Sequence, residues 1–330
     1  MRKTLRPLVA LLVLVLGFCV ASAGSASAAP ALRKTRTVQT TFASTTTAAG
    51  FGVTTPGGFR AAAELDQVAQ VAGAAPSVVM AYSDFAHSLD VAGLDAVAAR
   101  GATPMITWEP WVWGGGINQP AYSLARITAG AYDGYLRSWA KGLRSWGKPV
   151  YLRFAHEMNG DWYPWSERVN GNRPGDYVAA WRHVRAVFDA QKVTNVRWVW
   201  SPNVSYPGSL DLRSVFPGGK YVDVVAVDGY NWGAAAAWSA WTNPDQLFGA
   251  TLAELRSIAP GTPIGIAEVA SAEQGGSKAT WVSDFFTWMR SQPDLAFFVW
   301  FDQAKEADWR IDSSQSSAAA FAAGLAALRS

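Results

Sequence analysis

The strongest constraint on the fold is a repeated alternation that begins at residue 50 and continues to the end of the chain. Short runs of β-branched and aromatic residues alternate with longer stretches of Ala, Leu and charged residues. The short runs predict strands and the longer stretches predict helices, a pattern typical of βα units around a parallel sheet. Eight strands are predicted, over residues 51–54, 77–83, 103–109, 149–157, 196–202, 222–230, 263–269 and 295–302.

Helices are predicted between these strands and after the last one. They span residues 59–71, 91–99, 123–146, 176–190, 245–258, 277–290 and 316–328, and the connection around 210–216 is short and irregular. Eight such units in this length predict an α/β fold, a single-domain (β/α)8 TIM barrel over residues 50–330. A doubly wound parallel sheet is the alternative, but no glycine-rich phosphate-binding turn follows the first strand.

The residues before the barrel have a different composition. Basic residues precede an apolar run over residues 8–20, and small residues follow through Ala29. This pattern predicts a secretory signal peptide over residues 1–29, removed during export. Residues 30–49 are rich in Thr, Ala and Ser and predict a flexible leader. We therefore expect a secreted, extracellular protein that is monomeric and has no membrane attachment after signal cleavage.

Charge and residue usage make several kinds of chemistry unexpected. Signal cleavage leaves 25 basic against 25 acidic residues, so no nucleic-acid surface is expected. His87, His156 and His183 have no ligand-like spacing, so neither a catalytic metal nor another cofactor is expected. The chain has no G-x-S-x-G turn and no lysine at a predicted strand end. It therefore lacks the signatures of a serine hydrolase or a Schiff-base enzyme.

In a (β/α)8 barrel the active site lies at the carboxyl ends of the strands. Side chains along each strand alternate between the barrel interior and the surrounding helices. Glu157 is therefore expected to share the inward face of its strand with Arg153. On the seventh strand Glu268 is expected to face inward, which leaves Gly265 and Ala267 facing the helices.

Two carboxyl groups at one barrel mouth suit the cleavage of glycosidic bonds, because one can protonate the leaving oxygen while the other attacks or activates water. Glu157 is expected to have the raised pKa, and Glu268 to stay ionised with Tyr230 as a hydrogen-bond donor. Two interpretations of Arg153 remain open. It is either a cationic neighbour of the site or half of a buried structural ion pair with Asp228.

Tryptophan is unusually frequent, with 17 in the chain, and several fall at or just after predicted strand ends. Indole rings can stack on the C–H faces of sugar rings and can equally fill a hydrophobic core. Trp108, Trp162 and Trp300 are candidates for either role. A non-catalytic carbohydrate-binding barrel would keep the aromatic rings, but it would not need both Glu157 and Glu268.

The segment that ends the fourth strand resembles glycoside hydrolase family 26. It reads Arg153-Phe154-Ala155-His156-Glu157-Met158-Asn159-Gly160-Asp161-Trp162-Tyr163-Pro164-Trp165, and the resemblance continues at Asp228-Gly229-Tyr230-Asn231 and Ile266-Ala267-Glu268. The likeness implies that Glu157 is the acid/base and Glu268 the nucleophile of a retaining enzyme. It further implies that His156 precedes the acid/base, Trp162 contacts sugar and Tyr230 positions the nucleophile.

The resemblance also implies a polysaccharide substrate, because related enzymes act on β-1,4-mannan, mixed-linkage β-1,3-1,4-glucan or β-1,3-xylan. The leading expectation is a secreted retaining endo-β-glycanase acting on β-1,4-mannan, while the other polymers and exo attack stay open.

One departure from the mannan-cleaving relatives bears on the choice of polymer. They carry Trp-His where this chain has Trp108-Glu109. An ionised glutamate only accepts hydrogen bonds, whereas a neutral histidine also donates one. Glu109 therefore favours β-glucan or another polymer, unless it only caps the loop that follows it.

Overall fold

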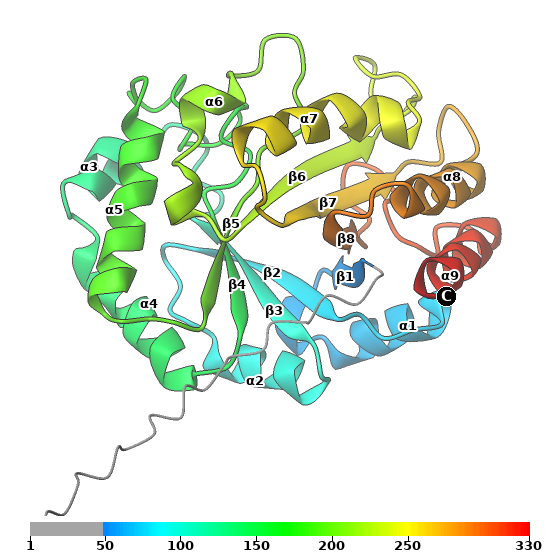
Figure 1. Ribbon diagram of the computed structural model, residues 1–330, viewed down its shortest axis with the longest axis horizontal. Helices are drawn as coiled ribbons and strands as arrows, with labels where there is room; N and C mark the ends of the chain where they lie inside the picture. The colour runs from blue at the N-terminus through cyan, green and yellow to red at the C-terminus, as the bar shows by residue number, and fades with distance from the viewer. Residues whose placement is uncertain (1–48) are drawn as a thin grey trace, which may run out of the picture. The chain divides into compact units, whose positions relative to one another are not determined.

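The computed structural model describes residues 49–330, which form a closed barrel of parallel strands in the order β1 to β8 (Figure 1). Each strand pairs with the next one, and β8 pairs with β1. The strands are β1 (Gly50–Thr54), β2 (Val78–Asp84), β3 (Thr103–Glu109), β4 (Val150–Phe154), β5 (Val196–Trp200), β6 (Val224–Asn231), β7 (Ile264–Ser271) and β8 (Leu295–Phe301). The predicted (β/α)8 barrel is confirmed, and closure excludes the doubly wound sheet. The predicted signal peptide (1–29) and all but the last residue of the predicted leader (30–49) lie outside the described residues.

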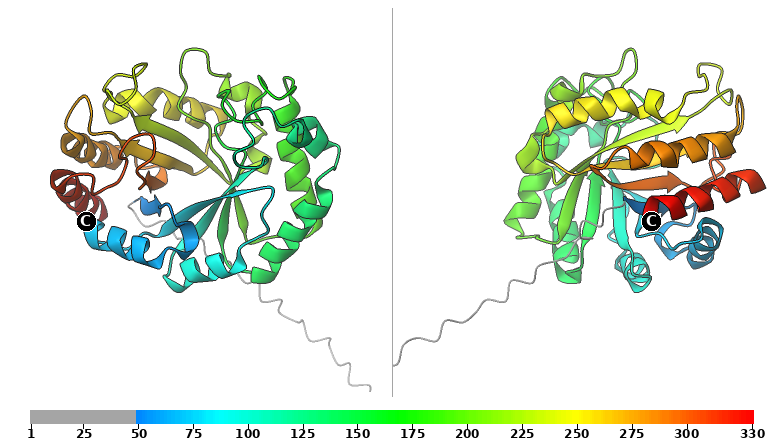
Figure 2. Two further views of the ribbon diagram at one scale, coloured as in Figure 1. Left: turned by 180° about the vertical axis from the view of Figure 1, so that it is seen from behind. Right: turned by 45° about the vertical axis from the view of Figure 1, so that its right-hand side comes forward.

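Helices surround the barrel on its outside (Figure 2). They are η1 (Gly58–Arg60), α1 (Ala62–Ala72), α2 (Val91–Ala99), η2 (Pro120–Tyr122), α3 (Leu124–Thr128), α4 (Asp133–Trp146), α5 (Asp176–Ala190), α6 (Leu212–Val215), η3 (Gly219–Tyr221), α7 (Pro244–Ile258), α8 (Lys278–Arg290) and α9 (Gln315–Arg329). The single helix predicted over 123–146 is divided into α3 and α4. Gly130 lies between them with φ of +84°, a left-handed conformation that interrupts a helix.

The barrel has two apolar cores that meet at the sheet. The larger core fills the space between the sheet and the helices. The smaller core fills the barrel interior with Val78, Met80, Met105, Val199, Val224, Ala226, Ala267, Phe297 and Val299. Because apolar side chains plug the interior, the inward-facing polar side chains gather toward the carboxyl ends of the strands.

Strand β7 departs from simple alternation. Ala267 packs in the barrel interior, and a Cβ built on Gly265 would lie 2.5 Å from the ring of Phe297, an interior residue. The prediction that these two small residues face the helices was therefore wrong. The register of β7 against β6 skips Ala267, and the register against β8 shifts between Ile266 and Val269. This β-bulge lets Glu268 face inward as well, immediately after an inward-facing alanine.

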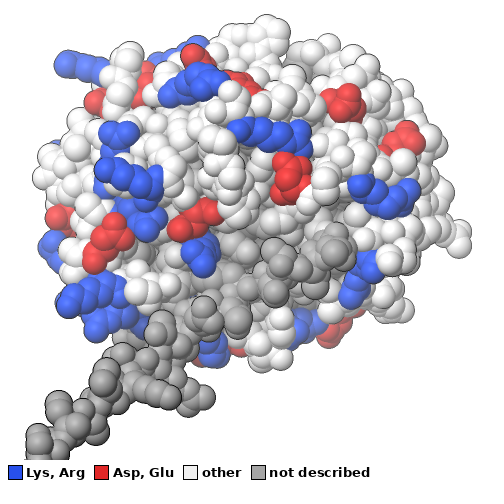
Figure 3. Space-filling view, in the orientation of Figure 1, with Lys and Arg blue, Asp and Glu red and all other residues white. Residues whose placement is uncertain are grey.

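Within residues 49–330, no helix combines the length and apolar character needed to cross a membrane. Figure 3 shows basic and acidic side chains interspersed over one face of the protein.

We predict that Gly265→Ala lowers the free energy of unfolding by about 1–3 kcal/mol, because the added methyl group collides with the packed ring of Phe297. The matched control is Gly134→Ala in the first turn of α4, where a Cβ would meet nothing within 4 Å. This control should not destabilise the protein, because Ala is favoured over Gly in a helix by about 0.5–1 kcal/mol. Denaturant unfolding of both variants makes the comparison, and equal effects would contradict the interior position of Gly265.

Candidate active site

The backbone around Glu157 is held in an unfavourable conformation. Strand β4 ends at Phe154, not at residue 157 as predicted, and Ala155 and Glu157 have φ of +47° and +51°. Residues with a Cβ rarely adopt this left-handed conformation, and it persists only where neighbouring structure imposes it. The Glu157 N–H donates to the carbonyl of Ser201, just beyond β5, at 2.8 Å. The neighbouring strand therefore helps to hold Glu157 in place.

The carboxyl group of Glu157 accepts two neutral hydrogen bonds. Trp162 Nε1 donates to Oε2 at 2.7 Å, and Asn203 Nδ2 donates to Oε1 at 3.1 Å. Burial, with a contribution from the nearby charge of Glu268, raises the pKa of Glu157 to about 7, while the two donors oppose the shift. A carboxyl group with this pKa can exchange a proton near neutral pH.

Glu268 has a different environment, because two phenols and a guanidinium donate to it. Tyr82 OH donates to Oε1 at 2.7 Å, Tyr230 OH donates to Oε2, and Arg153 Nη2 donates to Oε1. The side chain is buried, with the residue only 5% exposed. Donors of this kind stabilise a buried carboxylate in its ionised form.

Arg153 lies below both carboxyl groups and is completely buried. Its Nη1 donates to Asp228 at 2.6 Å, and its Nε donates to Thr107 Oγ1 at 2.9 Å. Burial disfavours the charged guanidinium, but Asp228 and Glu268 outweigh this effect and raise the pKa of Arg153. Both sequence-based interpretations of Arg153 therefore apply, since it pairs with Asp228 and also contacts Glu268.

His156 is buried beside the site, with its ring 4.8 Å from that of Tyr163 and 5.7 Å from that of Trp165. Its Nδ1 has no hydrogen-bond partner among residues 49–330. Burial, with a contribution from Arg153, lowers the pKa of His156 well below its usual value. The imidazole is therefore neutral.

Trp108 and Trp300 do not line the site. Both are completely buried on the helix side of the sheet. Trp108 Nε1 donates to Tyr135 of α4 at 3.1 Å and its ring stacks on Trp139, while Trp300 Nε1 donates to the carbonyl of Trp309 at 2.8 Å. Of the two roles that the sequence left open for Trp108 and Trp300, the structure therefore supports packing in the core. Strand alternation predicts this position. Glu109 faces inward, so Trp108, the residue before it, faces the helices.

Glu109 faces the barrel mouth and accepts hydrogen bonds from Trp113 Nε1 at 2.5 Å and Trp111 Nε1 at 3.3 Å. Burial raises the pKa of Glu109 to about 7, and the two indole donors oppose the rise. Glu109 thus holds Trp113, a residue that is 44% exposed. Glu109 therefore binds the loop that follows it and also lies near the charges of Arg153 and Glu268, so both sequence-based interpretations of this residue stay open.

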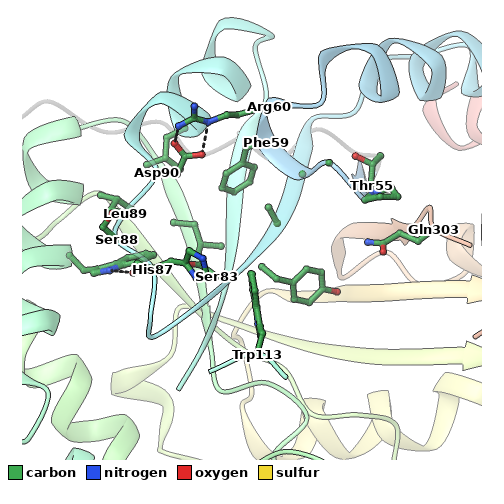
Figure 4. Close-up of a pocket in the computed structure, with 18 residues that line it drawn as sticks. Thr55, Phe59, Arg60, Ser83, His87, Ser88, Leu89, Asp90, Trp113 and Gln303 are labelled. Atoms are coloured by element: carbon green, nitrogen blue, oxygen red, sulfur yellow. Dashed lines mark hydrogen bonds and ion pairs between the residues drawn. The ribbon is translucent and has the colours of Figure 1, made fainter. Parts of the chain in front are cut away.

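A cavity of about 670 Å³ adjoins these residues, with Trp113, Ser83 and Gln303 around it (Figure 4). Tyr82 lines the cavity and its hydroxyl donates to Glu268, so the cavity lies next to the candidate site, although neither Glu157 nor Glu268 lines it. Thr55 also lines it, is buried, and has an Oγ1 without a hydrogen-bond partner among the described residues. The cavity therefore combines an aromatic surface with polar groups, as sugar-binding sites do.

Two residues of the site were missed by the sequence-based reasoning. Tyr82 lies on the inward face of β2 with Met80, a position that strand alternation could have identified. Asn203 lies just beyond β5, where polar strand-end residues are expected. Among the described residues, no three His, Cys, Asp or Glu side chains are grouped closely enough to hold a metal ion.

Residues 32–288 of the chain match the family model described as glycosyl hydrolase family 26. The chain belongs to this family. It is 41% identical to Endoglucanase H of Acetivibrio thermocellus over 240 residues, which are 71% of this chain and 25% of that protein. It is 36% identical to mannan endo-1,4-beta-mannosidase A and B of Caldalkalibacillus mannanilyticus over 94 residues, 27% of this chain and 18% of that protein. This family 26 chain thus spans a quarter or less of both curated relatives.

Solved structures share the fold. The catalytic domain of the family 26 endo-β-1,4-mannanase from Bacillus sp. JAMB-750 superimposes with a TM-score of 0.64 at 17% identity, covering 86% of both chains. The family 26 β-mannanase BoMan26A from Bacteroides ovatus gives a TM-score of 0.62 at 18% identity and covers 86% of this chain and 90% of that one.

We predict that Asn203→Ala raises the pKa of Glu157 above about 7, because the ionised carboxylate loses a hydrogen-bond donor. Trp162→Phe removes the second donor and should act in the same direction. Carbon-13 NMR titration of glutamate-labelled protein measures the pKa, and Glu157→Gln identifies the resonance. An unchanged or lowered pKa in both variants would contradict the assigned contacts.

Proposed function

We propose that this family 26 chain is a retaining endo-β-glycanase, with Glu157 as acid/base and Glu268 as nucleophile. The observation that carries the proposal is the contrast between the two buried carboxyl groups. Glu157 accepts only neutral donors and its pKa is raised to about 7. Glu268 is bound by Arg153 and by two phenols. Two environments that separate the protonation states of neighbouring carboxyl groups suit an acid and a nucleophile.

In the first step, Glu268 attacks the anomeric carbon while protonated Glu157 gives its proton to the departing glycosidic oxygen. The products are a glycosyl ester on Glu268 and a released sugar chain. In the second step, ionised Glu157 takes a proton from water, and the resulting hydroxide displaces Glu268 from the anomeric carbon. Tyr230 and Tyr82 orient the nucleophile, and Arg153 stabilises it when it leaves as a carboxylate.

The substrate we place first is β-1,4-mannan, because several curated relatives are named mannan endo-1,4-beta-mannosidases. The cavity beside Tyr82 and Trp113 would hold sugar residues on one side of the cleaved bond.

Mixed-linkage β-glucan is the second candidate, and two observations favour it. The alignment with Endoglucanase H is longer and more identical than the alignments with the mannosidases. In addition, Glu109 presents a carboxyl group at the barrel mouth, where the mannan-cleaving pattern has histidine. A site built around one hydrogen-bond arrangement discriminates strongly against a sugar that leaves buried polar groups unpaired.

We further propose that the protein acts outside the cell as a monomer. The predicted signal peptide over residues 1–29 supports export. Export would bring the enzyme into contact with polysaccharides too large to enter a cell.

We predict that Glu157→Ala lowers kcat/KM on the best polymer of a panel by about 10²- to 10⁴-fold, because the glycosidic oxygen then leaves without a proton. Aryl glycosides with good leaving groups need little protonation, so their kcat/KM should change far less. The panel contains galactomannan, mixed-linkage glucan and β-1,3-xylan. Equal losses on the polymer and the aryl glycoside would reject the acid/base role, and absence of hydrolysis across the panel by wild-type protein would reject the substrate class.

The isosteric variant Glu157→Gln provides the control. It has the same shape but no acidic proton to transfer, so it should reproduce the selective loss. Its single carbonyl oxygen can accept from Asn203 or from Trp162 but not from both, so its unfolding curve is recorded alongside.

A further inference from the structure

We propose that Trp238 forms an additional sugar-binding platform for the same polymer, remote from the cleaved bond; this inference rests on the proposed function. Trp238 lies in the loop between β6 and α7 and is 75% exposed. That loop, residues 232–243, contains no charged residue. In Figures 1 and 2 it projects beyond the tip of β6, at the barrel end that carries the site.

Trp238 belongs to a small group of exposed tryptophans. Trp113, Trp162 and Trp238 are at least 36% exposed, and they follow β3, β4 and β6 respectively. Trp113 donates to Glu109 and Trp162 donates to Glu157, so the first two border the site directly. The third lies on the same end of the barrel but contacts neither carboxyl group in any described hydrogen bond.

An aromatic row connects Trp238 with the nucleophile. The ring of Tyr230, whose hydroxyl donates to Glu268, lies 6.3 Å from the ring of Trp232. The ring of Trp232 lies 5.2 Å from that of Trp238. Trp309 packs edge-on against Trp232 at 4.8 Å and supports the middle of the row. A polymer with one sugar at Glu268 therefore has a continuous aromatic path outward to Trp238.

The loop that presents Trp238 is anchored at both ends. Near its start, the Ala234 N–H donates to the carbonyl of Gln274 at 2.9 Å. Near its end, the Thr242 N–H donates to Asn231 Oδ1 at 3.1 Å, and Trp281 Nε1 donates to the Thr242 carbonyl at 2.7 Å. An indole displayed on an anchored loop loses little conformational freedom on binding, which favours a preformed site.

The occupant that fits is a sugar ring. The indole of Trp238 offers a flat apolar face, and the surrounding alanines and serine add no charge with which to bind an ionic ligand. One exposed aromatic ring is far smaller than the apolar area of a stable protein interface, whereas a single sugar ring can cover it.

The test uses Glu268→Gln as a non-hydrolysing background and measures binding of the best polymer and of a short aryl glycoside by calorimetry. Trp238→Ala should weaken polymer binding roughly fivefold to tenfold. Trp238→Phe, which keeps a planar ring, should retain most of the affinity, and binding of the aryl glycoside should not change. Trp146→Ala is the matched control, because Trp146 ends α4 near the amino end of β4, away from the site.

Unchanged polymer binding by Trp238→Ala would overturn the inference, and so would equal losses in the Ala and Phe variants. Equal weakening of the polymer and the short glycoside would also overturn it, because the platform would then not be remote. Failure of the proposed function has a different signature: wild-type protein binds the polymer in a Trp238-dependent manner but does not cleave it. Self-association that Trp238→Ala abolishes, without a change in polymer binding, would assign the ring to a protein contact instead.

Discussion

The candidate site depends on one buried positive charge. Arg153 has no exposed side-chain surface and donates to Asp228, Glu268 and Thr107. Removing charges from water is costly, and an interior ion pair is stable only when good geometry and further hydrogen bonds compensate. Here one guanidinium faces two carboxyl groups, and burial raises the pKa of Asp228 well above its usual value although Arg153 opposes the rise. Tyr82 and Tyr230 also donate to Glu268, and Ser201 Oγ donates to Asp228 Oδ1 at 2.8 Å.

That arrangement has a consequence for the second carboxyl group. Arg153 and the phenols keep negative charge on Glu268, and this charge adds to burial in raising the pKa of Glu157. Glu157 has no cation within hydrogen-bonding reach among its described contacts, only an indole and an amide. The two glutamates therefore lie in different environments, although they share one barrel mouth. The left-handed backbone conformation of Glu157 helps to place its carboxyl group at the barrel mouth.

Periodicity in the sequence predicts the strands well, because alternation of apolar residues is a local property. It fails where the backbone departs from regular geometry. The left-handed turn after Phe154 ends β4 early, and because of the bulge at Ala267 the residues of β7 before Glu268 have faces opposite to those predicted. Contacts between strands that are distant in the sequence could not be predicted from local patterns either. Tyr82 and Glu268 meet only because closure of the barrel brings β2 and β7 to a common interior. By contrast, alternation along β3 favours a core position for Trp108, which is one of the two roles that the sequence left open.

The most direct measurement of the central claim is covalent trapping by an activated 2-deoxy-2-fluoro β-glycoside of the preferred sugar. The fluorine slows both steps, and the good leaving group lets the first step proceed faster than the second. Mass spectrometry of the intact protein, followed by peptide mapping, should find one glycosyl group on Glu268, and Glu268→Gln should remain unlabelled. Labelling of a different residue, or turnover of the parent glycoside with inversion and no trapped ester, would contradict the account.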